Sequence, residues 1–189
     1  KLYCKDILKI TKKPVSFEVF ADDEKNMYNQ GIAINSWGKN VFVKIPITNS
    51  KGIFMKKVIQ NLNNKGIKLN ITAVYSANQT KKILKIINKK TRVIISIFAG
   101  RMADVGKDPI LEIKKSINLS KKYKNVEILW ASTREPYNFL QAKNLQCNII
   151  TVPPQIIEKI EKFGKTFYQL TVDTVKGFLV DSKKSNFRI

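Results

Sequence analysis

Polar residues interrupt several short apolar runs of this sequence, and one of them suits covalent chemistry on a carbonyl. Lys44 lies in the run Val-Phe-Val-Lys-Ile-Pro at residues 41–46. Side chains alternate along a strand, so Lys44 falls on the face opposite Val41 and Val43. An amine held among apolar residues favours its neutral form, which attacks carbonyls to give a Schiff base. We predict Lys44 as this nucleophile; the alternative is a lysine that shields an edge strand.

Carboxylate, amide and hydroxyl groups recur at similar places in the other runs. A Schiff base forms and hydrolyses through proton transfers, which a water held by Glu18 and Thr72 would carry. Arg101 and Arg134 follow two later runs and would form a fork for a phosphate. The structural alternatives are a solvent-facing glutamate and satisfied core hydroxyls. The predicted site residues are Lys44, Glu18 and Thr72 as catalytic groups, and Asn70, Ser96, Phe98, Arg101, Ser132 and Arg134 as substrate-binding groups.

The elements that must position these groups alternate between strand and helix. Apolar runs predict strands at residues 15–20, 41–45, 69–73, 93–98, 126–130 and 148–152. Helical spacing follows at residues 54–62, ended by Asn64-Lys65-Gly66, and at residues 83–87, with Ser76 as the N-cap. Alternation of this kind indicates parallel strands with right-handed crossovers, and no nucleotide-binding glycine motif occurs. A barrel with its site at the carboxyl ends of the strands is therefore expected.

Charge is the strongest feature of the composition. The 189 residues carry a net charge of +21, and histidine is absent, which excludes histidine-based catalysis or metal binding. Lysine pairs recur beside Ile and Leu at helical spacing, which is typical of solvated helix faces; a basic nucleic-acid-binding protein is the alternative. We expect no metal, no cofactor and no membrane span, and a reduced protein in the cytoplasm, since Cys4 and Cys147 match no metal or redox spacing.

Five stretches together resemble the transaldolase and fructose-6-phosphate aldolase family. The first, Val-Lys-Ile-Pro-Ile-Thr at 43–48, resembles the Schiff-base lysine strand, and Asn-Ile-Thr-Ala-Val-Tyr-Ser at 70–76 resembles the strand that carries the catalytic-water threonine. Ser-Ile-Phe-Ala-Gly-Arg at 96–101 and Ala-Ser-Thr-Arg at 131–134 resemble the substrate and phosphate loops, with Thr133 in place of the usual Phe. Thr-Val-Pro-Pro at 151–154 resembles the turn after the last strand.

The resemblance implies a role for each matching residue. Lys44 would form the imine with the dihydroxyacetone part of a ketose, and Glu18 and Thr72 would position the water. Asn70 and Ser132 would bind the hydroxyls of that unit. Glu18 and Phe98 match the transaldolase branch, whereas the aldolase branch has Gln and Tyr at these positions. This implies transfer of the three-carbon unit from fructose 6-phosphate to erythrose 4-phosphate, in the pentose phosphate pathway.

The same resemblance implies a (β/α)8 TIM barrel of which strands 3 to 8 are visible. The family's first-strand Asp, the general acid/base of carbon–carbon cleavage, and its second-strand Thr-Asn-Pro are absent. We therefore expect a single domain over residues 1–189 that is incomplete at its N-terminus, with a C-terminal helix at about 172–183. An aldolase activity, a catalytically impaired relative and a nucleic-acid-binding protein remain as alternatives. Small transaldolases form rings, which implies a pentamer or decamer.

Overall fold

The structure, a computed structural model, describes residues 2–185. Its helices and strands alternate along the chain as the sequence predicts. In chain order the elements are α1 (Leu2–Ile10), β1 (Val15–Glu18), α2 (Glu24–Asn35), β2 (Val41–Pro46), α3 (Lys56–Asn64), β3 (Leu69–Val74), α4 (Ala77–Leu84), β4 (Val93–Ile97), α5 (Ala99–Ala103), α6 (Ile110–Ser120), β5 (Val126–Trp130), α7 (Tyr137–Asn144), β6 (Ile149–Ile150), α8 (Pro154–Ile160) and α9 (Phe167–Ser185).

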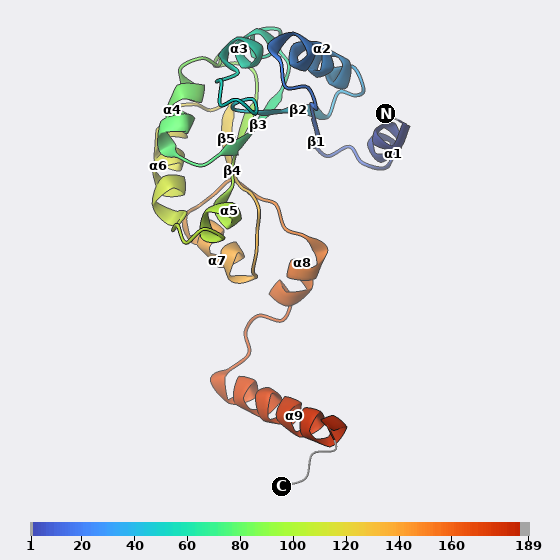
Figure 1. Cartoon of the computed structure of the whole chain (residues 1–189), viewed down its shortest axis with the longest axis vertical. Coiled ribbons are helices and arrows are strands. Elements are labelled where there is room, and N and C mark those ends of the chain that lie inside the picture. The colour runs from blue at the N-terminus through green and yellow to red at the C-terminus, as the bar shows by residue number, and fades with distance from the viewer. Residues whose placement is uncertain (1, 186–189) are drawn as a thin grey trace.

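The six strands form one parallel sheet in sequential order, β1 to β6. The sheet is curled, and α2, α3, α4 and α6 follow its outer side (Figure 1). This confirms the α/β class and the sequential parallel order that a barrel requires. Among the described residues β1 and β6 do not pair with each other, so these six strands make a partial barrel with two open edges.

Two apolar layers explain why nearly continuous apolar runs became strands. Val41, Val43 and Ile45 face the helices and belong to the main core, in which they are fully buried. The alternate residues face the inner side, where Phe42 packs in a second, smaller cluster with Ile94. A parallel sheet covered on both faces produces this pattern.

The predicted helix signals act as expected at two places. The Ser76 side chain accepts a hydrogen bond from the Gln79 amide, and the Gln79 side chain accepts one from the Ser76 amide, which forms a capping box for α4. Gly66 follows α3 with a φ of +80°, the left-handed conformation that ends helices.

Helix α9 begins five residues before the expected start at residue 172. The cause is a second capping box, in which the Thr166 hydroxyl accepts a hydrogen bond from the Gln169 amide and the Gln169 side chain accepts one from the Thr166 amide. The helix lies away from the sheet (Figure 1), and none of its residues is buried.

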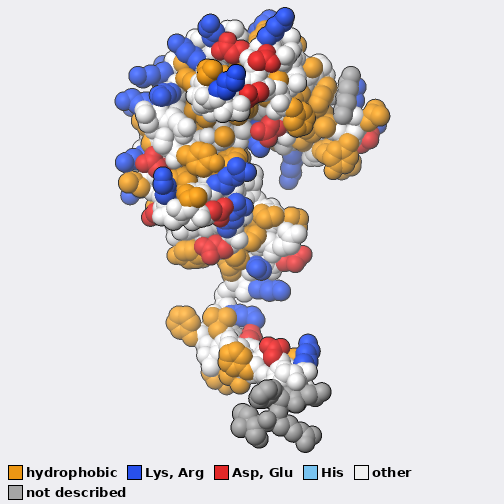
Figure 2. All heavy atoms as spheres, viewed as in Figure 1, with side chains coloured by type: hydrophobic (Ala, Val, Ile, Leu, Met, Phe, Trp, Pro, Cys, Tyr) orange, Lys and Arg blue, Asp and Glu red, His pale blue; other side chains and the backbone are white. Residues whose placement is uncertain are grey.

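On the face of the molecule that Figure 2 shows, basic side chains are not gathered in one patch. Lys and Arg side chains are spread over the visible face among acidic and apolar ones (Figure 2). This agrees with lysine pairs on solvated helix faces. Within residues 2–185, no helix combines the length and the apolar character that a membrane crossing needs.

Candidate functional site

The inner face of the curled sheet contains a cavity of about 640 Å³. It lies on the side of Ile94 and Leu129, opposite the helices. Its lining combines apolar floor residues with several converging polar groups, as small-molecule sites do. Six of the predicted site residues line this cavity: Lys44, Asn70, Ser96, Phe98, Arg101 and Ser132.

Lys44 lies near the carboxyl end of β2 and forms an ion pair with Glu18 on β1. The Lys44 Nζ is 3.2 Å from the Glu18 Oε2, and parallel pairing sets the two residues side by side. The side chains are 28% and 43% exposed, respectively. The Lys44 amine is thus partly exposed, because β1 is an edge strand here and one side of the pair meets solvent. The pair places a proton acceptor next to the predicted nucleophile.

Asn70 connects three strands through hydrogen bonds across the inner face. Its Nδ2 donates to the Ser16 Oγ on β1 at 3.0 Å, and its Oδ1 accepts from the Ser96 Oγ on β4 at 2.7 Å. Strand β2 lies between β1 and β3, so the first bond spans a strand, which only a curled sheet allows. Both ends of the Asn70 amide are thus fixed beside Lys44, its partner across the β2–β3 pairing.

Thr72 lies at a bulge in β3. The pairing of β3 with β4 shifts between Ile71 and Val74, and Ala73 takes a left-handed φ of 58°. Bulges and left-handed non-glycine residues concentrate near functional sites, because the surrounding fold must hold them in place. Thr72 is 2% exposed, and its hydroxyl has no partner among the described residues. It is not among the cavity-lining residues, but a buried hydroxyl without a partner can accept a water.

Phe98 and Arg101 form one wall of the cavity. The Arg101 guanidinium lies 5.3 Å from the centre of the Phe98 ring, at the distance of a cation–π contact. Tyr75 packs edge-on against the same ring at 5.9 Å. The short helix α5 starts directly after Phe98, so the cation remains near the carboxyl end of β4.

Ser132 follows β5 in a left-handed conformation, with a φ of 68°. Its carbonyl oxygen would be 1.6 Å from a Cβ placed on Gly100, so only glycine permits this approach of the loop to α5. Thr133 departs from the family motif, and its hydroxyl donates to the Thr151 carbonyl at 2.7 Å. That bond ties the loop to the end of β6.

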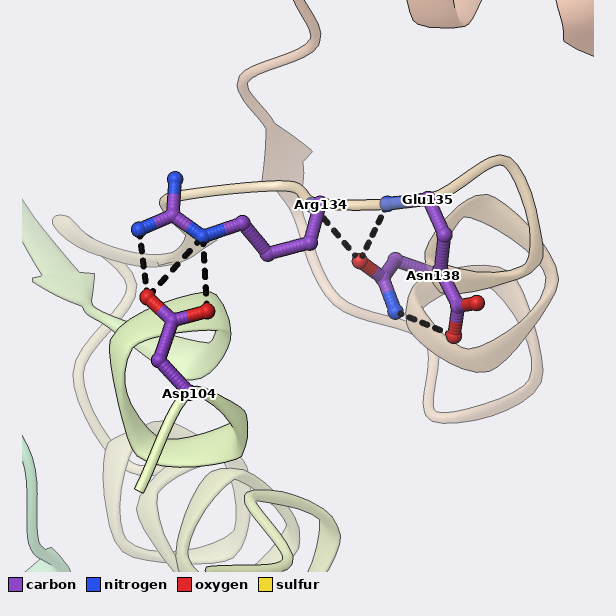
Figure 3. A network of polar contacts seen from close by, with 4 residues as sticks. All are labelled: Asp104, Arg134, Glu135 and Asn138. Atoms are coloured by element: carbon purple, nitrogen blue, oxygen red, sulfur yellow. Dashed lines mark hydrogen bonds and ion pairs between the residues drawn. The ribbon is translucent and has the colours of Figure 1, made fainter. Parts of the chain in front are cut away.

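Arg134, like Glu18 and Thr72, is not among the residues that line the cavity. Its Nε lies 3.0 Å from the Asp104 Oδ1, and its Nη2 lies 2.6 Å from the Asp104 Oδ2 (Figure 3). The Arg134 hydrogen bond, with the charges of Arg134 and Arg101, holds the pKa of Asp104 below its ordinary value. The same hydrogen bond raises the pKa of Arg134. Two arginines converging on one phosphate are therefore not the arrangement of the described chain.

Several cavity residues were not predicted. Ser16 shares a face with Glu18, which was a usable signal, and Thr151 belongs to the matched turn. Lys13 also lines the cavity, but nothing distinguishes it in sequence from the many other lysines.

At the amino ends of the strands, Lys68 and Arg92 each lie 5.3 Å from the Phe42 ring. Burial and the nearby Arg92 charge lower the pKa of Lys68.

Comparison with known proteins agrees with this geometry. The family model described as Transaldolase/Fructose-6-phosphate aldolase matches residues 2–189. A protein of Nitrosopumilus maritimus (strain SCM1) named "Probable transaldolase" is 32% identical over 181 residues, which cover 95% of this chain and 76% of that protein. A Thermoanaerobacter sp. (strain X514) protein of the same name is 30% identical over 186 residues, or 98% of this chain and 80% of that protein.

A solved structure supports the fold alone. A mandelate oxidase mutant with the monooxide FMN adduct superposes with a TM-score of 0.57 at 11% sequence identity. The match covers 78% of this chain and 50% of the mandelate oxidase chain. The match to the family model and the two relatives, in contrast, extend over nearly all of this sequence. The chain therefore belongs to the transaldolase/fructose-6-phosphate aldolase family.

Proposed function

We propose that this protein is a transaldolase that moves a dihydroxyacetone unit from fructose 6-phosphate to erythrose 4-phosphate through a Schiff base on Lys44. The observation that carries the proposal is the position of Lys44. Its side chain lines the 640 Å³ cavity with Asn70 and Ser96 and has the Glu18 carboxylate 3.2 Å away. A nucleophile, a proton acceptor and neutral hydrogen-bonding groups thus surround one space, as imine chemistry requires.

Imine formation begins with a proton transfer. The Lys44 ammonium gives a proton to Glu18, directly or through a water that the Thr72 hydroxyl helps to hold. The neutral amine then adds to the ketose carbonyl carbon, and the carbonyl oxygen takes up a proton. That oxygen takes a second proton from the Glu18 carboxylic acid and departs as water. A carbon–nitrogen double bond remains on Lys44. Glu18 thus acts as base and then as acid.

Cleavage then breaks the bond between C3 and C4 of the sugar, one bond away from the imine carbon C2. A base removes the proton of the hydroxyl on C4, and the electrons of the C3–C4 bond move into the protonated imine. The part of the sugar that begins at C4 leaves as an aldehyde. The three-carbon unit stays on Lys44 as an enamine and attacks the acceptor aldehyde. Phe98 has no hydroxyl to protonate that enamine, which supports transfer over release. Asn70, Ser96 and Ser132 provide the polar contacts for the hydroxyls of the unit.

The base of the cleavage step has no counterpart among the predicted residues of the described chain. We propose that two more strands complete a (β/α)8 barrel between the open edges of β1 and β6 and carry it. The strand order supports this, because β1 and β6 are the two ends of the parallel sheet and do not pair with each other among the described residues. The exposure of the Glu18 side chain, 43%, agrees with an edge strand that another strand would cover.

The rest of the proposal concerns assembly and location. We propose a homo-oligomer, a pentamer or decamer, in which α9 packs on a neighbouring copy. The exposed apolar residues of α9 support it, among them Phe167, Phe178 and Leu179, which are 91%, 67% and 54% exposed. We propose that the reaction belongs to the pentose phosphate pathway in the cytoplasm, where the free thiols of Cys4 and Cys147 would remain reduced.

A coupled assay on the full-length protein tests the function. With fructose 6-phosphate and erythrose 4-phosphate together, glyceraldehyde 3-phosphate should form, and Lys44→Met should abolish it. Lys57→Met on the outer helix α3 makes the same change at an exposed site and should keep the activity. Release of free dihydroxyacetone without an acceptor would contradict the transferase and indicate an aldolase.

A further inference from the structure

We propose that Asp104 sets the phosphate affinity of the site by competing with the ligand for the guanidinium of Arg134. This inference rests on the proposed function, a reaction of phosphorylated sugars, and on the phosphate-binding role that the sequence predicts for Arg134. It adds a positioning residue, Asp104, that acts through Arg134 and has no place in the matched motifs. The competing ligand is a phosphate dianion, as carried by a phosphorylated sugar.

The geometry of the pair is that of a site occupied by an internal anion. The Asp104 carboxylate, at the C-terminal end of α5, contacts the Arg134 Nε at 3.0 and 3.1 Å and the Nη2 at 2.6 Å. This side-on, two-pronged contact is the one by which arginine also binds phosphate oxygens. Within residues 2–185, the remaining nitrogen, Nη1, donates to no acceptor.

The backbone beneath the guanidinium is fixed separately. The Asn138 Oδ1 accepts hydrogen bonds from the Arg134 amide at 3.0 Å and the Glu135 amide at 3.3 Å (Figure 3). The Asn138 Nδ2 is held in turn by the Gln141 side chain at 2.9 Å. The loop therefore keeps its place when the pair opens, and only the Arg134 side chain has to move toward the cavity.

The electrostatics make the pair displaceable. Arg134 and Asp104 are 48% and 46% exposed, and ion pairs with this exposure stabilise a fold only weakly. A phosphate dianion carries more charge than a carboxylate and offers three acceptor oxygens. Arg101, whose charge also acts on Asp104, lines the cavity close by. A bound phosphate can therefore contact both Arg101 and Arg134. Its affinity is lowered by the free energy needed to break the contact between Arg134 and Asp104.

Asp104→Asn separates this competition from a purely orienting role, because the two predict opposite signs. The test measures the dissociation constant of inorganic phosphate by calorimetry at fixed salt, on the full-length protein. We expect binding about two- to fivefold tighter than in the wild type, the range given by loss of one exposed pair. Weaker or unchanged phosphate binding would overturn the proposal. If Asp104 instead oriented Arg134 for phosphate, its replacement would weaken phosphate binding.

Two further variants exclude a general charge effect. Glu127→Gln breaks another exposed arginine–carboxylate pair, with Arg92 at 2.7 Å, and makes the same change in net charge. It should leave phosphate binding unchanged. In an Arg134→Ala background, Asp104→Asn should have no effect. Equal tightening in Glu127→Gln, or tightening that persists without Arg134, would contradict the inference.

Steady-state kinetics provide a readout that a structural role would not move. In Asp104→Asn the KM for erythrose 4-phosphate should fall by the same factor, with kcat and the kinetics of unphosphorylated erythrose unchanged. Equal changes for both acceptors would contradict a phosphate-specific effect. Failure of the imine chemistry with tighter phosphate binding would refute the proposed function alone. Normal turnover without tighter binding would refute this inference alone.

Discussion

At the residue scale, two buried threonines with opposite surroundings separate catalysis from stability. The hydroxyl of Thr72, in β3, has no partner among the described residues. Thr80 is equally buried in α4, but its hydroxyl is 2.9 Å from the Ser116 hydroxyl. A buried hydroxyl without a hydrogen-bond partner lowers the stability of a fold. Removal of a buried hydroxyl that has a partner is also destabilising, because the partner then loses its hydrogen bond. The sheet therefore tolerates Thr72 at some cost, which is expected at a functional site.

Thr72→Val should impair turnover without loss of stability. The isosteric valine removes only the hydroxyl, so the free energy of unfolding should change by less than about 1 kcal/mol. Loss of the water contact should lower kcat by about 10²-fold. Urea unfolding and the coupled assay measure the two effects.

Thr80→Val is the matched control for that substitution. It leaves the buried Ser116 hydroxyl without its partner and should cost about 1–3 kcal/mol of unfolding free energy, with kcat unchanged. The reverse pattern, in which Thr72→Val destabilises the fold and leaves kcat intact, would show that Thr72 has a structural role.

The sequence was informative at the residue scale where a polar type is unusual for its place. Lys44, Asn70 and Ser96 interrupt apolar strands, and alternation within each strand separates the polar side chain from its apolar neighbours. Arg134 comes just after a predicted strand, so its position near the strand end could be expected. Its ion pair with Asp104, however, joins side chains that are 30 positions apart in the sequence. No periodicity specifies such a contact, which is why the expected arginine fork was not recovered.

At the element scale, the position of the Ser132 loop depends on one glycine in α5. A Cβ on Gly100 would lie 1.6 Å from the Ser132 carbonyl oxygen and 2.9 Å from the Arg134 side chain. Backbone cannot yield as a flexible side chain does, so the loop or the helix must shift. Gly177 in α9 has no atom within 4 Å of such a Cβ.

Gly100→Ala should therefore displace the loop and cost roughly 1–3 kcal/mol or more of unfolding free energy, as overpacking does. It should also raise the KM for phosphorylated acceptors. Gly177→Ala should be neutral or stabilising by up to about 1 kcal/mol, because alanine is the better helix former. Thermal unfolding of both variants checks this. Equal stability of the two would contradict the close approach.

The elements themselves were predicted well because their signals are local. All six strand runs appear as strands, and each strand end lies within two residues of the predicted one. The Ser76 cap was found from its own side-chain chemistry. The start of α9 was missed although Thr166 and Gln169 carry the same capping pattern. The bulge at Ala73 had no local signal, since alanine does not favour a left-handed φ.

At the scale of the whole molecule, the two open edges and α9 share one property: each leaves groups that a compact barrel would cover. The edges present unpaired backbone groups, and α9 presents large apolar side chains to solvent. What covers them depends on contacts outside the described residues.

Phe178→Glu should reduce the oligomer to smaller species, because a charge buried against a neighbouring copy is costly. Sedimentation velocity of the full-length protein measures this. Leu111→Glu, on α6, introduces the same charge at a leucine that is 56% exposed, and should leave the oligomer intact. An unchanged sedimentation coefficient in Phe178→Glu would contradict the role of α9.

The covalent link to Lys44 is the claim on which the whole account depends, and borohydride trapping tests it most directly. Full-length protein reduced in the presence of fructose 6-phosphate should gain the mass of one reduced dihydroxyacetone unit, and peptide mapping should locate it on Lys44. Lys13, the other lysine that lines the cavity, is the relevant competitor. The adduct should persist in Lys13→Met and disappear in Lys44→Met. An adduct that remains in Lys44→Met, or none in the wild type, would contradict the account.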